Sequence, residues 1–335
     1  MASTFLNSLQ DGLKSLFEQD PRVMLLGEDV LDPYGGAFKV TAGLSTLYPD
    51  RVLTTPISEA AITGVGAGLA LRGYVPIIEI MFGDFLTLCA DQIVNHATKF
   101  PLMFPNVDCP LIIRAPMGGG RGYGPTHSQS LEKMFLGVPG LKIVAPSHFH
   151  VPGKTLRRVV ANEHGPVIFI EHKQLYSEKL QGSVPDLHLD LVSDEAGYDV
   201  AVVRNYQRGE PDVGVIAYGG ATRQLPKLLR EMAVEEIRVI VIIPECIDPI
   251  PRKLLSHYAS ESNRIVVVDE GHDGFTWAAG VASLLYEDLW GKLHAPIRIV
   301  ASDRTIIPSS SAQEAEMLIS KEKIEAAIVE IISWA

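Results

Sequence analysis

Short runs of apolar residues recur along the first half of the chain, and turn-forming residues bound each run. The runs are continuous rather than alternating, which is typical of strands buried on both faces of a parallel sheet. We expect strands at 23–26, 75–82, 111–116, 142–146 and 166–171. Apolar positions at helical spacing predict helices between them, at 59–71, 84–99 and 152–163. Strands alternating with helices predict an α/β domain.

A second series of apolar runs begins near residue 212. It predicts strands at 212–220, 237–245, 264–270 and 296–302, and helices to about 233, at 275–290 and at 312–331. Residues 178–212 between the two series are polar and contain prolines, glycines and many acids, which is typical of a linker. We therefore predict two doubly wound α/β domains, over 1–180 and 212–335, with a linker or excursion at 181–211.

The N-terminal segment is amphipathic rather than apolar throughout. Five large apolar residues recur in it at helical spacing: Phe5, Leu9, Leu13, Leu16 and Phe17. The segment lacks the basic region and continuous apolar stretch of a signal peptide. No apolar run in the chain reaches the roughly 18 residues that a membrane span needs. We therefore expect a cytoplasmic protein without a membrane partner.

The composition is typical of a globular protein. Its 335 residues are 47% hydrophobic and 21% charged, enough for a core in each domain. The formal net charge of -11 argues against nucleic-acid and anionic-membrane partners, which require a basic face. Cys89, Cys109 and Cys246 form no CxxC pair. We expect buried structural thiols and no metal site in this chain.

The first polar cluster among apolar neighbours is TTPISEA, at 54–60. Glu59 begins a very apolar predicted helix, and Ser58 before it is a candidate cap. One interpretation is a first-turn acid stabilised by the helix dipole. The other is a buried carboxyl with a raised pKa, able to hold and pass a proton. Spacing alone leaves both open.

The second polar cluster is GPTHSQS, at 124–130, which follows a glycine run at 118–120. His127 stands after a predicted strand, where α/β sheets place their sites. It is either a satisfied structural histidine or a catalytic one. The glycine run is either an ordinary turn or a loop that approaches a ligand. A further glycine-rich stretch at 66–73 lacks the spacing of a dinucleotide-binding turn and favours helix packing instead.

Around these clusters the sequence resembles the β subunits of the thiamine-diphosphate-dependent 2-oxo acid dehydrogenases, in the transketolase-like superfamily. The pyruvate and branched-chain oxo acid branches are the most similar. The resemblance covers most of the chain and rests on LLGEDV at 25–30, YGGAFKVTAGL at 34–44, RVLTTPISEAAITGVGAGLAL at 51–71, EIMFGDFLTLCADQIVNHATK at 79–99, THSQS at 126–130, PGLKIVAPS at 139–147 and PVIFIEHKQLY at 166–176.

The resemblance implies a pyrimidine-binding domain followed by a transketolase C-terminal-like domain. In this family thiamine diphosphate lies between an α and a β subunit. The α side holds the diphosphate and Mg²⁺ through a GDG motif, which this chain lacks. The resemblance therefore implies an α subunit as partner, an α2β2 heterotetramer, and a chain that is catalytically incomplete alone.

The resemblance also implies roles for single residues. Glu59 would contact the aminopyrimidine and share a proton with a ring nitrogen, and His127 would face the substrate and the acyl acceptor. Four more residues would lie around the cofactor: Glu28, Ile57, Phe85 and Gln92. Phe85 would pack on the pyrimidine, unless it is simply a core aromatic. Tyr34 is a weaker candidate, as is a structural K⁺ near the 111–113 and 160–166 loops.

The second domain departs from the family pattern. The segments IIPECIDPIP at 242–251, HDGFTWAAG at 272–280 and IIPSSSAQEA at 306–315 stand where the family has other motifs. In the large complexes this region docks the lipoyl acyltransferase core, so these departures argue against that partner rather than against the chemistry. We therefore expect the acyl group to pass to lipoamide or to another acceptor.

The sequence thus predicts a subunit that decarboxylates a 2-oxo acid. A two-subunit thiamine-dependent carboligase or ketol transferase is the first alternative. A non-catalytic scaffold paralogue is the second. The presence of both Glu59 and His127 favours an enzyme, because a scaffold has no physical need of a carboxyl in an apolar pocket.

Overall fold

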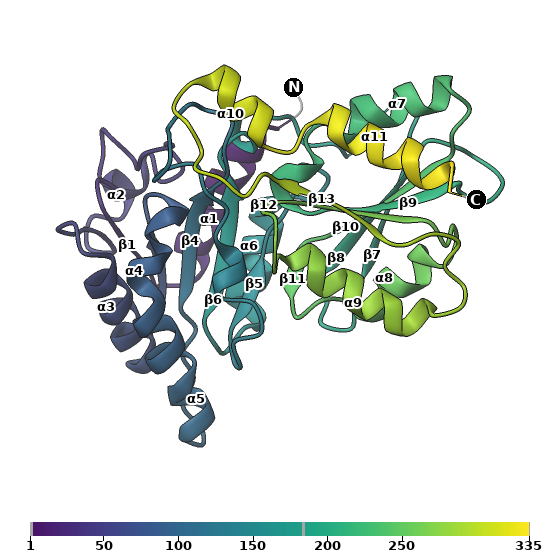
Figure 1. Cartoon of the computed structure of the whole chain (residues 1–335). Coiled ribbons are helices and arrows are strands. Elements are labelled where there is room, and N and C mark those ends of the chain that lie inside the picture. Colours follow the sequence, from purple (N-terminus) through teal and green to yellow (C-terminus); the bar gives the residue numbers. More distant parts are fainter. Residues whose placement is uncertain (1–2, 183–184, 335) are drawn as a thin grey trace.

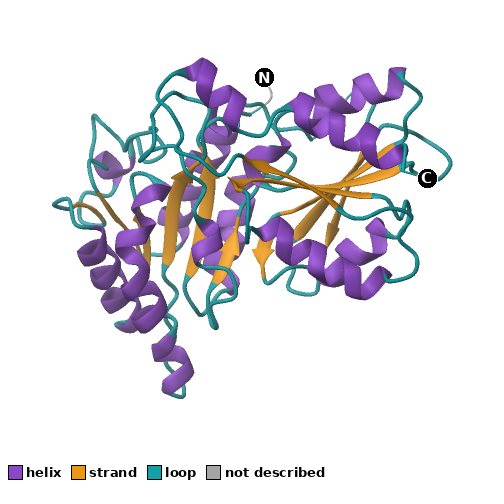
Figure 2. Cartoon of the chain, in the orientation of Figure 1, coloured by secondary structure: helices purple, strands orange, loops and turns teal. Residues whose placement is uncertain are grey.

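The computed structural model describes residues 3–182 and 185–334. They form two α/β domains that lie side by side (Figure 1). Each domain has a mostly parallel sheet with helices on both faces (Figure 2). The two-domain α/β prediction is therefore confirmed. Within the described ranges, no helix is long and apolar enough to cross a membrane.

The first sheet has seven strands in the order β11-β5-β6-β4-β3-β1-β2. Neighbouring strands of this sheet run parallel, with one exception. The strand β11 (Cys246–Asp248) comes from the second half of the chain and pairs antiparallel with β5. The other strands are β1 (Val23–Gly27), β2 (Val52–Thr54), β3 (Val75–Glu79), β4 (Ile112–Met117), β5 (Lys142–Val144) and β6 (Val167–His172). The five strands predicted from apolar runs are all present.

Helices cover both faces of this sheet. On one face α1 (Phe5–Gln19) packs against α6 (Pro152–Asn162). On the other lie α3 (Glu59–Leu71), α4 (Leu86–Asp91) and the π-helix η2 (Gln92–Ala97). The remaining short helices are α2 (Leu44–Leu47), η1 (Gly83–Phe85), α5 (Lys99–Met103), η3 (Glu132–Met134) and η4 (Leu175–Ser177). The single helix predicted at 84–99 is therefore wrong, because a π-helix interrupts the α-helical spacing.

The second sheet has six strands in the order β13-β12-β9-β10-β8-β7. The four strands of its parallel part are β9 (Val213–Ile216), β10 (Val239–Pro244), β12 (Ile265–His272) and β13 (Arg298–Ser302). Two antiparallel strands complete it, β7 (His188–Ser193) and β8 (Asp199–Arg204).

These two antiparallel strands correct the linker predicted at 181–211. β8 is almost fully buried, whereas β7 is the edge strand and is mostly exposed. An edge strand with water on one side carries polar residues, as His188, Asp190 and Ser193 do here. The polar residues at 188–193 therefore belong to the edge strand of a sheet, and the buried β8 follows them.

The second sheet is also covered on both faces. The helices α7 (Leu225–Val234) and α11 (Lys321–Ile332) lie on one face, and α8 (Arg252–Ala259) and α9 (Trp277–Leu289) lie on the other (Figure 1). The short helix η5 (Gly219–Thr222) precedes α7. The helix predicted at 312–331 is divided into α10 (Ser311–Met317) and α11, and α10 lies over the edge of the first domain (Figure 1).

One hydrophobic core runs through both domains. It contains Ile62 and Ile93 from the helices of the first domain and Trp277 from the second. The rings of Tyr218 and Trp277 pack edge to face in this core, with 4.8 Å between their centroids. Because apolar burial links the domains, groups of the second domain are held against the first.

Candidate functional site

Two buried carboxyl groups lie where β1 ends and α3 begins. Glu28 is 7% exposed and Glu59 is 6% exposed. Burial raises the pKa of Glu28, and the neighbouring charges of Glu59 and Asp29 raise it further. Oε1 of Glu28 is buried and has no hydrogen-bond partner among the described residues. The pair therefore offers proton acceptors, and one of them is free for a ligand.

The start of α3 holds Glu59 in place. The backbone carbonyl of Glu59 accepts a hydrogen bond from Oγ1 of Thr63 at 2.8 Å. Ser58 stands at the N-cap position, but its side chain makes no capping hydrogen bond, so the expected cap is wrong. The rest of the helix is apolar and packs on β3 and α4. A carboxylate in the first turn faces the positive end of the helix dipole.

Cys89 connects this carboxyl pair to the neighbouring helix. Its Sγ atom lies 3.6 Å from the backbone oxygen of Glu59 and 3.7 Å from that of Phe85. Burial raises the pKa of the Cys89 thiol to about 12, and the charges of Glu59 and Glu28 add to the rise. The thiol is therefore neutral and structural, as are the buried Cys109 and Cys246, and that prediction is confirmed.

The ring of His127 lies in an aromatic cluster next to these groups. Its centroid is 5.3 Å from that of Phe85 and 4.6 Å from that of Phe82, both edge to face. Oγ1 of Thr126 lies 2.9 Å from Nδ1 of His127. The imidazole is half-buried, so it keeps access to a molecule outside the chain. The structure thus brings Phe85 and His127 together.

A buried lysine anchors the segment that carries His127. Lys173 is 1% exposed, and its Nζ donates a hydrogen bond to the backbone oxygen of His127. Burial lowers the pKa of Lys173 to about 8, although the nearby carboxylates of Asp84 and Glu270 oppose the change. The lysine fixes the backbone of the histidine and leaves its imidazole free.

A buried carboxylate holds the same segment from the other side. Oδ1 of Asp84 lies 3.3 Å from the backbone nitrogen of Gln129 and 2.9 Å from its Nε2. Oδ2 of Asp84 and Oγ of Ser128 are buried, and the described part of the chain provides neither with a hydrogen-bond partner. Two unsatisfied buried polar atoms thus belong to the residues that hold or adjoin His127, and another molecule could satisfy them.

The other residues named from the sequence are more exposed. Ile57 is 83% exposed, close to the buried Glu59 in the chain. Gln92 is half-buried at the start of the π-helix, and its Nε2 donates to Asp91 at 3.1 Å. Tyr34 is 48% exposed, with Nζ of Lys39 3.9 Å from its ring centroid. Their roles toward a cofactor stay predictions.

Sequence reasoning missed the buried polar residues at the carboxyl ends of the strands. Glu171, His172 and Lys173 form one such run at the end of β6. Glu171 binds Arg114, which also binds Glu79, and all three are fully buried or nearly so. Charged residues at the end of an apolar run indicate the carboxyl edge of a sheet, where sites lie. The sequence EHK at 171–173 has this pattern.

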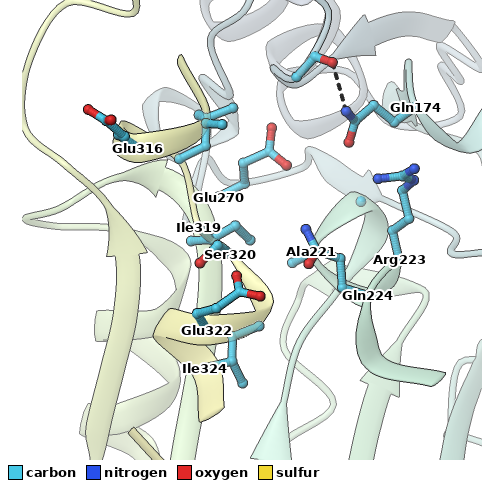
Figure 3. A pocket seen from close by; sticks show the side chains of 14 residues that line it. Gln174, Ala221, Arg223, Gln224, Glu270, Glu316, Ile319, Ser320, Glu322 and Ile324 are labelled. Atoms are coloured by element: carbon cyan, nitrogen blue, oxygen red, sulfur yellow. Dashed lines mark hydrogen bonds between the residues drawn. The ribbon is translucent and has the colours of Figure 1, made fainter. Parts of the chain in front are cut away.

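One cavity between the two domains lies away from these residues. It has a volume of about 390 Å³, and it opens at the carboxyl ends of β9 and β12, between the two domains (Figure 3). Its walls include Gln174 of the first domain and Arg223, Glu270 and Ser320 of the second. None of the site residues predicted from the sequence lines it. The buried carboxyl pair and the half-buried His127 are outside its walls.

Comparison with known proteins agrees with this arrangement. Residues 2–179 match the transketolase pyrimidine binding domain, and residues 204–324 match the transketolase C-terminal domain. The chain is also similar to a solved structure of a split-gene transketolase described as an inactive β4 tetramer, with a TM-score of 0.72 and 18% identity over 98% of this chain and 97% of that one. This last likeness supports the fold.

The chain is also similar to β subunits of characterised enzymes. It is 33% identical to that of the acetoin:2,6-dichlorophenolindophenol oxidoreductase of Cupriavidus necator, over 96% of this chain and 94% of the relative. It is 32% identical to that of the 2-oxoisovalerate dehydrogenase of Bacillus subtilis, over 99% of each. Identity to the pyruvate dehydrogenase E1 β subunit of Staphylococcus epidermidis is 31%, over 97% of each. The chain therefore belongs to the transketolase-like family that contains the E1 β subunits of 2-oxo acid dehydrogenases.

Proposed function

We propose that this chain is the β subunit of a thiamine-diphosphate-dependent enzyme that decarboxylates a 2-oxo acid. The single observation that carries the proposal is the buried Glu28–Glu59 pair beside Phe85 and His127. The unpaired Oε1 of Glu28 fits a heterocycle that has both N–H groups and a basic ring nitrogen, as an aminopyrimidine does. The residues present therefore fit thiamine diphosphate.

Each residue of the pair has a distinct task in this proposal. Glu59 holds a proton toward the basic ring nitrogen of the aminopyrimidine, and Glu28 accepts an N–H through its free oxygen. Because burial raises the pKa of Glu28, its carboxyl holds a proton more readily than an exposed one does. Phe85 offers an aromatic face for the ring. Thiamine diphosphate supplies the electron sink for loss of CO2.

His127 acts on the substrate side. Its imidazole is half-buried and stands edge to face with two aromatic rings, so only part of it faces outward. It orients the oxo acid or the acyl acceptor and holds or moves a proton at an imidazole nitrogen. Phe82 and Phe85 beside it exclude water from one side of the reacting group.

An α subunit completes the site. Oε1 of Glu28 has no hydrogen-bond partner among the described residues, and the sequence has no GDG motif for a diphosphate and Mg²⁺. We place both groups on the α subunit of an α2β2 heterotetramer. A K⁺ near 111–113 and 160–166 and a lipoyl acyltransferase core remain part of the proposal, as does a cytoplasmic location.

A second substrate class has its own support. The identities to the acetoin oxidoreductase β subunit and to the 2-oxoisovalerate dehydrogenase β subunit are 33% and 32%, which are nearly equal. The substrate is therefore a 2-oxo acid or a hydroxyketone such as acetoin. Both reactions cleave a bond next to a carbonyl carbon, and the same cofactor would serve both.

The test is a substrate panel with the assembled α–β pair. The pair would be supplied with thiamine diphosphate and Mg²⁺, and CO2 release would be measured with pyruvate and branched 2-oxo acids. Dichlorophenolindophenol reduction would be measured with acetoin. We expect one substrate to dominate. A pair that binds the cofactor but turns over none of these substrates would favour ketol transfer or carboligation instead.

A further inference from the structure

The glycine-rich loop that leads to His127 is held by a carboxylate of the second domain. Oε1 of Glu314 accepts a hydrogen bond from the backbone N–H of Gly120 at 2.9 Å. Oε2 accepts one from the N–H of Gly122 at 2.7 Å. Glu314 is 1% exposed and lies in α10, and 194 residues separate it from Gly120 in the sequence. One carboxylate thus binds two N–H groups of the same loop.

A second carboxylate holds the beginning of the same loop. Oε1 of Glu270, at the end of β12, accepts the N–H of Gly119 at 2.7 Å. Its Oε2 lies 2.8 Å from Nε2 of His172. Burial alone would raise the pKa of Glu270, but His172 beside it holds that pKa below its usual range. The carboxylate is therefore charged when it binds the loop.

Glu270 is also connected to His127 through His172 and Lys173. His172, its partner, is followed by Lys173, whose Nζ donates to the backbone oxygen of His127. Figure 3 shows Glu270 between the two domains, with Gln174 donating to the carbonyl of Gly120 at 2.9 Å. The loop before His127 and the backbone of His127 itself are thus tied to one network.

The loop packs closely against the end of β6 and the residues after it. A side-chain carbon added at Gly118 would lie 1.9 Å from Nε2 of His172, and one added at Gly120 would lie 1.9 Å from Nε2 of Gln174. Both glycines have positive φ angles, of 90° and 80°. Only glycine combines this backbone conformation with such close approach. A side chain at Gly118 would therefore displace the loop from His172.

From these contacts we propose that the second domain positions His127, with Glu270 and Glu314 as positioning residues. The inference rests on the proposed function, in which His127 faces the substrate. Together the two carboxylates bind three N–H groups of the loop. They hold the imidazole against Phe82 and Phe85, at the edge of the cofactor half-site. Glu314 lies in the 306–315 segment, whose sequence departs from the family motif. This segment nevertheless contacts the loop that leads to His127.

The test compares two substitutions in the same helix. Glu314→Gln turns one acceptor into an N–H₂ donor that faces a loop N–H, without a change in size. Glu316→Gln is the matched control, because Glu316 is exposed in the same α10 helix and its side chain does not bind the loop. Both would be made in the assembled α–β enzyme. Hydrogen exchange of residues 118–130, kcat and the Kd of thiamine diphosphate would be measured for each.

We expect Glu314→Gln to speed hydrogen exchange in 118–130 and to lower kcat by roughly 10- to 100-fold, because a small misplacement of a catalytic group has effects of this size. The Kd of thiamine diphosphate should stay within about twofold, since the buried carboxyl pair is untouched. Glu316→Gln should match the wild type in every measurement. If Glu314→Gln does not fold, Glu270→Gln should give the same pattern.

Two results would overturn the inference. One is unchanged hydrogen exchange in the Glu314→Gln loop. The other is an equal loss of kcat in the Glu316→Gln control. A wild-type enzyme that turns over no 2-oxo acid and no acetoin would instead count against the proposed function. The exchange measurement separates the two cases, because it needs no substrate.

Discussion

The rings of Phe85 and His127 meet edge to face, with 5.3 Å between their centroids. Phe85 directly precedes α4, whereas His127 follows β4 in the polar cluster at 124–130. Their contact joins these two segments, and Sγ of Cys89, within 3.7 Å of the backbone oxygens of Phe85 and Glu59, links them to the start of α3. One site can therefore hold a cofactor ring and a substrate together.

Replacing Glu59 by Gln should abolish most of the activity and leave the fold intact. An amide of the same size cannot exchange a proton with a ring nitrogen, so we expect CO2 release or acetoin oxidation to fall by about 100-fold or more. The unfolding midpoint should hardly change. Glu18→Gln, at an exposed position in α1, is the control. A Glu59→Gln enzyme with near-normal kcat would exclude the proton-holding role.

Removing the Arg114 side chain should destabilise the first domain strongly. Its guanidinium is fully buried and binds Glu79 at 2.5 Å and Glu171 at 2.6 Å. Arg114→Met leaves two buried carboxylates without their counter-charge, and we expect a loss of about 3–5 kcal/mol in urea unfolding. Arg22→Met removes an exposed ion pair with Asp20 and should cost less than about 1 kcal/mol. Equal losses in the two variants would contradict this assignment.

Glu132 should make stability fall as the pH rises. Burial raises the pKa of Glu132, and the charge of Asp269 raises it further, although the hydroxyl of Tyr218 donates to it at 2.6 Å. Because the folded-state pKa lies above the unfolded value, the unfolded chain releases the proton first. Stability is then fully present below the unfolded pKa and is lost as the pH rises through the folded pKa.

The variant Glu132→Gln isolates this effect, since an amide does not ionise. It should be more stable than the wild type at about pH 8, by on the order of 1–2 kcal/mol, and the difference should shrink at about pH 5. Urea unfolding at the two pH values measures it. A constant difference between the two proteins would mean that Glu132 does not titrate in this range.

Local patterns in the sequence predicted much of the fold. Continuous apolar runs marked the parallel strands, and the helix at 59–71 lies where its spacing placed it. The same criterion missed β7, because an exposed edge strand has no continuous apolar run. It also missed β11, which has three residues and joins the sheet of the other domain. Neither its length nor its partner is encoded locally.

The candidate site was predictable only in part. The polar clusters and the family resemblance pointed to Glu59 and His127. The sequence did not indicate that Glu314 meets the glycine loop, because nothing local relates a helix near the C-terminus to a loop 194 residues away. Lys173 was missed for a similar reason, since its burial and its hydrogen bond depend on tertiary packing.

The most direct test of the central claim is calorimetry of thiamine diphosphate binding in the presence of Mg²⁺. Three samples would be titrated: this chain alone, the chain assembled with its α subunit, and the assembled Glu59→Ala variant. The split site predicts tight binding by the assembled wild type, none by the chain alone, and clearly weaker binding by the variant. An intact assembled pair that binds no cofactor would contradict the catalytic assignment and leave a scaffold role.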